Sequence, residues 1–79
     1  MEKNKTKIGN FIFKTLNKLN SRYVNFEKNT DVFQQSLDSL DFMKLIFILE
    51  KKYKLKIDSK DFKNIQTINK LSKYIHKKI

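Results

Sequence analysis

Apolar residues recur at helical spacing in three stretches of the chain, and polar segments separate these stretches. The first stretch carries apolar side chains at intervals of three and four residues: Ile8, Phe11, Ile12, Leu16 and Leu19. This spacing predicts an amphipathic helix over about residues 5–19, with Thr6 or Asn4 as its N-terminal cap.

The longest apolar stretch begins after Ser39 and contains neither Gly nor Pro, which predicts a second helix over about residues 39–53. Asp38 and Ser39 stand at its start, and the side chains of both residue types accept hydrogen bonds from free N–H groups there. At 100° per residue, one arc of this helix is expected to face the core: Phe42, Met43, Leu45, Ile46, Leu49 and Tyr53. The opposite arc carries the charged residues: Asp41, Lys44, Lys51 and Lys52.

Three apolar residues of the second helix fall among or beside those charges. We place Ile48 in the middle of the charged arc and Leu40 and Phe47 at its edge. An apolar residue ringed by charges is a candidate contact for a partner, although single exposed apolar residues are also common.

Between and after these helices the pattern predicts a long loop and two shorter elements. Residues 20–38 lack a clean period and should form a loop, from which Phe26 and Phe33 anchor into the core. Residues 54–57 alternate like a strand but have no evident strand to pair with, so we expect an extended connector.

The C-terminal part of the chain predicts one short helix, at about 59–63, and a last helix at about 67–78. Thr67 is expected to cap the last helix. The residues expected to face inward from it are Ile68, Leu71, Tyr74, Ile75 and Ile79.

Composition supports a single all-α domain spanning residues 1–79. The chain has 79 residues, one Gly and no Pro, which argues against hairpin-linked strands. It has no Cys, which excludes disulfides, thiolate metal sites and a catalytic thiol. His76 is the single histidine and has no carboxylate cluster near it in the sequence, so we expect no metal site.

Ser39 stands where a phosphate group would be stabilised. The start of a helix concentrates partial positive charge and offers free N–H donors to an anion. Considered alone, however, a serine at this place is more simply a helix cap.

The motif Asp38-Ser39-Leu40-Asp41, with the helix that follows it and the segment Leu55-Lys56-Ile57, resembles the acyl carrier proteins. The last helix adds a Thr-x-x-x-Leu-x-x-Tyr-Ile pattern from Thr67 to Ile75. About half of the chain resembles the family well, and the N-terminal helix resembles it loosely. The resemblance implies a small four-helix bundle, with three long helices and one short helix, and a long loop between the first two.

The resemblance also implies a function that is not catalytic. Ser39 would carry 4′-phosphopantetheine, derived from coenzyme A, and the thiol of this group would hold an acyl group as a thioester. Ser36 competes for this role, but it lacks a preceding Asp and lies outside the helix start. The residues expected to dock partners are Asp38, Leu40, Asp41, Lys44, Phe47, Ile48 and Lys51.

The expected partners are a phosphopantetheinyl transferase and the acyl- or aminoacyl-activating and transferring enzymes of a pathway such as fatty acid or polyketide biosynthesis. We expect a monomer. We also expect no membrane insertion, because the second apolar segment is too short to span a bilayer. Asn10 and Lys14 interrupt the first apolar run and no cleavage site follows, so we expect no signal peptide and a cytoplasmic location.

The formal charge of +10 departs from the family, whose members are mostly acidic. Only residues 31–50 are acidic, with four acids and one Lys (net −3). Lys44, Lys51 and Lys52 stand where acids are common, which indicates either a dedicated set of partners or a lysine-rich composition.

Two alternative functions remain open. An aminoacyl or peptidyl carrier protein would share the same fold and motif. A small basic nucleic-acid-binding module would use the +10 charge and the ten aromatic residues (seven Phe, three Tyr). Against it, the chain has one Arg (Arg22), no Gly-rich clamp and no zinc-ligand spacing.

Overall fold

The computed structural model describes residues 5–79 and contains three α-helices and two short 3₁₀ helices in this range. The α-helices are α1 (Lys5–Leu19), α2 (Ser39–Tyr53) and α3 (Ile68–Lys78). The 3₁₀ helices are η1 (Ser21–Asn25) and η2 (Ser59–Asn64). Because no strand occurs between residues 5 and 79, the all-α prediction is confirmed.

The α-helices lie close to their predicted ranges, because capping residues define where two of them begin. Asp38 caps α2, and Thr67 caps α3, where its Oγ1 accepts a hydrogen bond from the Lys70 N–H at 3.0 Å. For α1, Thr6 lies inside the helix and Asn4 lies outside the described residues. The predicted loop 20–38 is less irregular than expected, since η1 occupies its first part.

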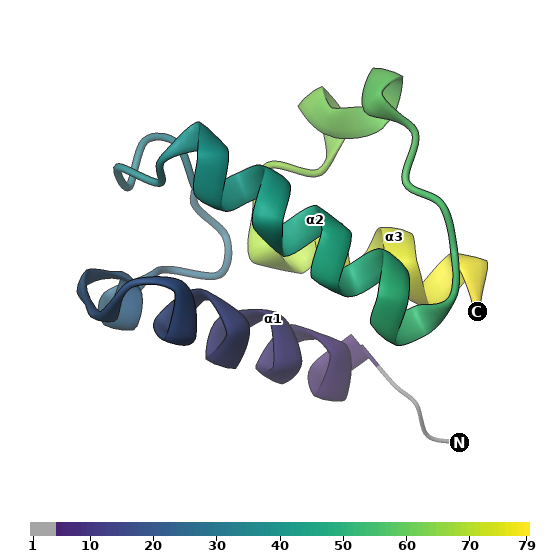
Figure 1. Ribbon diagram of the computed structural model, residues 1–79, viewed down its shortest axis with the longest axis horizontal. Coiled ribbons are helices and arrows are strands. Elements are labelled where there is room, and N and C mark those ends of the chain that lie inside the picture. Colours follow the sequence, from purple (N-terminus) through teal and green to yellow (C-terminus); the bar gives the residue numbers. More distant parts are fainter. Residues whose placement is uncertain (1–4) are drawn as a thin grey trace.

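The α-helices form a small bundle in which α1 packs chiefly against α3 and also contacts α2. In Figure 1, α2 crosses the front of the molecule, α1 lies below it and α3 runs behind it. The segment with η2 connects α2 to α3 on the side away from α1 (Figure 1). None of the helices within the described range has the length and apolar character needed to span a membrane.

A single glycine allows α1 to approach α3 closely. Gly9 and Ser72 are both buried, and a Cβ atom added at Gly9 would lie 3.2 Å from Ser72 Oγ. The Ser72 hydroxyl does not lack a partner, since it donates to the Ile68 carbonyl at 2.8 Å. A larger residue at position 9 would therefore push the two helices apart or displace this hydroxyl.

The core combines one face of each α-helix with residues from the connections. The helices contribute Ile8, Ile12, Leu16, Phe42, Leu45, Ile46, Leu49, Ile68, Leu71 and Ile75. The connections contribute Tyr23, Phe26, Val32, Leu37, Ile57 and Ile65. The four buried residues of α2 all belong to the predicted core arc, and Met43 and Tyr53 of that arc are half-buried.

The prediction that Ile48 lies in the middle of the charged arc of α2, with Leu40 and Phe47 at its edge, was wrong. Leu40 and Phe47 are exposed to 71% and 61%, whereas Ile48 is half-buried. The reason is that one side of α2 turns toward α1: the Lys52 Nζ lies 4.7 Å from the centre of the Phe11 ring. Ile48, four residues before Lys52, lies on that same side.

The expectation for Ile79 was also wrong, since this residue is 52% exposed. It follows the last helical residue, Lys78, and therefore does not continue the buried face of α3. Tyr74 is half-buried and donates a hydrogen bond to Asp61 in η2 at 2.8 Å.

The connector after α2 is held by the helix itself. Lys54 ends α2 in the left-handed conformation, with φ of 56°, and residues 55–58 continue without helix or strand. Glu50 Oε2 accepts a hydrogen bond from the Ile57 N–H at 2.8 Å, which fixes the connector beside the helix. The predicted connector 54–57 therefore begins one residue later than expected, because Lys54 belongs to the end of α2, and a glutamate of α2 holds the connector in place.

The burial pattern of α2 predicts which truncations destabilise the protein. Leu49 is fully buried, so Leu49→Ala should lower the free energy of unfolding by about 2–5 kcal/mol. Phe47→Ala, on the exposed side, should change it by no more than about 0.5 kcal/mol. Urea denaturation followed by circular dichroism measures both values, and equal losses would contradict this orientation of α2.

Candidate functional site

The start of α2 presents one serine hydroxyl to the solvent. Asp38 is the N-cap, and its Oδ1 accepts a hydrogen bond from the Leu40 N–H at 2.8 Å. Ser39 is the first helical residue and is exposed. Since Asp38 does the capping, the Ser39 hydroxyl takes no part in it, and no hydrogen bond within residues 5–79 engages this hydroxyl.

The surroundings of Ser39 fit a covalently attached phosphate group. The hydroxyl stands at the positive end of a helix of 15 residues, where the dipole favours an anion. The two neighbouring carboxylates, Asp38 and Asp41, each accept a hydrogen bond from the protein. Such bonds hold the carboxylates in place beside the serine, and the exposed hydroxyl leaves room for a bulky substituent.

A buried tyrosine in η1 fixes the position of this helix start. Tyr23 has no exposed surface, and its hydroxyl donates to Asp41 Oδ2 at 2.6 Å while accepting from the Asp38 N–H at 3.2 Å. It thus contacts the residues on both sides of the Ser39-Leu40 pair. Its ring also packs against Phe26, with 5.1 Å between centroids.

Sequence reasoning missed Tyr23, because an aromatic residue in an aperiodic loop carries no sign of which helix it contacts. The local signal was the residue before η1: Asn20 caps the short helix and accepts a hydrogen bond from the Arg22 N–H at 3.0 Å. The predicted anchors are both in contact with the core. Phe26 is buried, and half-buried Phe33 lies 5.1 Å from the Phe42 ring, centroid to centroid.

Ser36 has a different environment from Ser39. It is exposed in the turn before α2 and adopts the left-handed conformation, with φ of 73°. Its carbonyl accepts a hydrogen bond from Arg22 Nη2 at 3.4 Å, and the Arg22 guanidinium also lies over the Tyr23 ring. Ser36 is therefore a turn residue, and the dipole of α2 does not act on its hydroxyl as directly as on that of Ser39.

The residues expected to dock partners divide into two groups. Exposed residues are Asp38, Leu40, Lys44, Phe47 and Lys51. Asp41 and Ile48 are half-buried, and the Asp41 carboxylate is directed to Tyr23 inside the domain. The structure therefore brings most of the predicted docking residues to the surface of α2, and it turns Asp41 inward.

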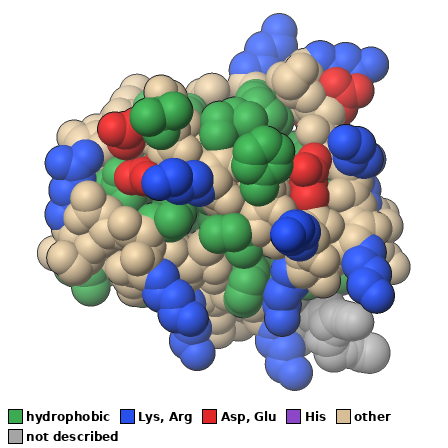
Figure 2. All heavy atoms as spheres, in the orientation of Figure 1, with side chains coloured by type: hydrophobic (Ala, Val, Ile, Leu, Met, Phe, Trp, Pro, Cys, Tyr) green, Lys and Arg blue, Asp and Glu red, His purple; other side chains and the backbone are tan. Residues whose placement is uncertain are grey.

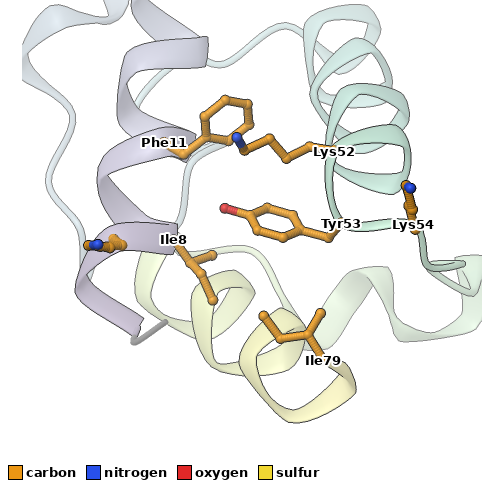
Figure 3. Close-up of a pocket in the computed structure, with 7 residues that line it drawn as sticks. Ile8, Phe11, Lys52, Tyr53, Lys54 and Ile79 are labelled. Carbon is orange, nitrogen blue, oxygen red and sulfur yellow. The ribbon is translucent and has the colours of Figure 1, made fainter. Parts of the chain in front are cut away.

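A pocket of about 530 Å³ lies at the other end of α2 and is not part of this site. In Figure 3, Lys52 and Tyr53 of α2 extend toward Phe11 of α1, and Ile79 lies at the edge. Burial raises the pKa of Tyr53 above its usual value. At 1.5 Å per residue, Tyr53 lies about 20 Å along the helix from Ser39.

Within residues 5–79, no group of three or more His, Cys, Asp or Glu side chains could hold a metal ion. His76 is exposed near the end of α3.

In a comparison with protein families, the chain matches the family described as phosphopantetheine attachment site. The match covers residues 21–75, which is more than half of the chain and includes η1, α2, η2 and most of α3. Comparisons with curated proteins and with solved structures gave no match.

The hydrogen bonds of Tyr23 predict a local effect on the start of α2. Tyr23→Phe removes the acceptor of the Asp38 N–H and the donor to Asp41, so it should lower the free energy of unfolding by about 1–3 kcal/mol. Amide hydrogen exchange, measured by NMR, should accelerate more at Asp38 and Leu40 than in the rest of α2.

Tyr74→Phe is the matched control, because Tyr74 also donates to an aspartate, Asp61, but does so away from Ser39. Burial is the main cause that raises the pKa of Tyr74, and this bond raises it further. Its removal should leave exchange at Asp38 and Leu40 unchanged. Equal acceleration in both variants would show that Tyr23 contributes only general stability.

Proposed function

We propose that the chain is an acyl carrier protein with its cofactor on Ser39. It belongs to the family of phosphopantetheine attachment domains. The family defines the general role: the chain is a carrier domain whose cofactor, 4′-phosphopantetheine, is covalently attached. The attachment residue, the acyl nature of the cargo and the partners are the proposed parts.

The observation that carries the proposal is the environment of Ser39. It is exposed, it follows the capping Asp38, and no hydrogen bond within the described residues occupies its hydroxyl. Ser36 is also exposed, but it stands in a turn with a left-handed backbone.

The attached group supplies a thiol that can hold cargo as a thioester, and the chain has no Cys that could do so itself. The chain's own contribution is positional. Asp38 and Tyr23 fix the first turn of α2, so Ser39 stands at a defined place on a rigid element. The core beneath, formed by residues such as Leu45 and Leu49, keeps that helix in one orientation.

We propose that the domain presents its cargo to other proteins and does not itself catalyse a reaction. The partners are a phosphopantetheinyl transferase and enzymes that load and transfer the acyl group. A monomer in the cytoplasm is the form that meets these partners. An aminoacyl or peptidyl carrier is the second candidate, since the exposed serine and its supporting bonds would serve either cargo equally well.

Incubation with coenzyme A, Mg²⁺ and a broad-specificity phosphopantetheinyl transferase tests the attachment site by intact mass. The wild type and Ser36→Ala should gain the mass of one phosphopantetheine, and Ser39→Ala should gain nothing. A thiol assay should be blank before the reaction and report one thiol per chain afterwards, because the chain has no Cys. Modification of Ser39→Ala would refute the assignment of Ser39, and failure of the wild type with every transferase tried would refute the carrier function.

A further inference from the structure

One face of α2 alternates apolar and basic side chains in a single exposed row. Leu40, Lys44, Phe47 and Lys51 follow one another at intervals of four, three and four residues, which places them on one side of the helix. All four are exposed, and Leu40 and Phe47 are the two most exposed large apolar residues of the described chain, at 71% and 61%. We call these four residues the exposed row.

The row lies on an open face of the molecule. Figure 2 shows the side that α2 crosses, where hydrophobic side chains reach the surface and Lys and Arg side chains lie around them. The row begins one residue after Ser39, so an enzyme that reaches this serine from the solvent also meets the row.

The acidic residues of the same region are engaged within the domain. Asp38 accepts from the Leu40 N–H, Asp41 accepts from the Tyr23 hydroxyl, and Glu50 accepts from the Ile57 N–H. Asp41 and Glu50 are also half-buried and flank the row on opposite sides of α2. The bonds of Asp41 and Glu50 direct these two carboxylates toward the domain, whereas Asp38 remains exposed beside Ser39.

A partner that approaches the row therefore meets two ammonium groups and two apolar side chains, with the exposed Asp38 at the end of the row nearest Ser39. Desolvating exposed apolar side chains favours association, whereas unpaired ammonium groups at the rim disfavour it. The complementary surface has a hollow for Leu40 and Phe47 and carboxylates opposite Lys44 and Lys51.

We propose that the exposed row docks onto an acid-rimmed apolar hollow in the phosphopantetheinyl transferase that natively modifies this chain. The inference rests on the proposed function, because it assumes an enzyme that acts at Ser39. It adds the charge of each docking surface, which is negative on the enzyme, from carboxylates, and positive on the carrier, from lysines.

The lysine-rich composition provides an internal control for this inference. Lys70 and Lys77 in α3 are exposed and, like Lys44 and Lys51, stand seven residues apart on one helix. Changing either pair to Glu alters the net charge of the chain by the same amount. Any difference between the two double variants therefore reports the place of the charges and not their number.

The test measures kcat/KM for transfer of phosphopantetheine from coenzyme A to the chain by its native transferase. Lys44→Glu/Lys51→Glu should lower kcat/KM roughly tenfold at low salt, since attraction becomes repulsion at two positions, and the loss should shrink as salt rises. Lys70→Glu/Lys77→Glu should change it less than about twofold. Circular dichroism of each variant establishes that it is folded.

The apolar half of the row has its own test. Phe47→Ala should lower kcat/KM by about tenfold at low and high salt alike, because removal of an apolar contact is not screened. Equal rates for wild type and Lys44→Glu/Lys51→Glu at low salt, or equal losses in the two double variants, would overturn the proposed docking sign. Absence of any modification of the folded wild type would instead count against the carrier function itself.

Discussion

The hydroxyl of Tyr23 is the interaction on which the geometry of the site depends. It joins a loop residue to the start of a helix that begins 16 positions later, and it does so through the backbone of Asp38 and the carboxylate of Asp41. A buried hydroxyl with both a donor and an acceptor role satisfied is stable only in one arrangement of its neighbours. The long loop is therefore not a passive connection, because it determines where α2 begins in space.

The fold and the position of Ser39 at the start of α2 were largely predictable from the sequence, because the signals for both are local. A capping Asp followed by a Gly-free apolar run defines the start of α2, and the position of Ser39 follows directly from it. The core arc of α2 was predictable because its period is strong. Thr67 is another local signal, because it caps the start of α3 as the sequence predicts.

Features that depend on contacts between distant segments were not predictable. Tyr23 and Asp41 are 18 residues apart, and no pattern in the sequence links them. The relative exposure of Phe47 and Ile48 depends on which side of α2 faces α1, and a wheel drawn for an isolated helix lacks that information. The bond between the Ile57 N–H and Glu50 likewise joins residues seven positions apart, and it depends on how the connector after α2 folds back beside the helix.

The lysines of the exposed row and the carboxylates that flank it differ in how freely they can change. The side chains of Lys44 and Lys51 are exposed and make no hydrogen bond within the described structure, so replacements there alter the surface and should change the free energy of unfolding by no more than about 0.5 kcal/mol. Positions 41 and 50 hold the loop and the connector, so a replacement there changes recognition and stability together. A chain built in this way can change its partners step by step through the lysines, while the carboxylates that support the fold remain in place.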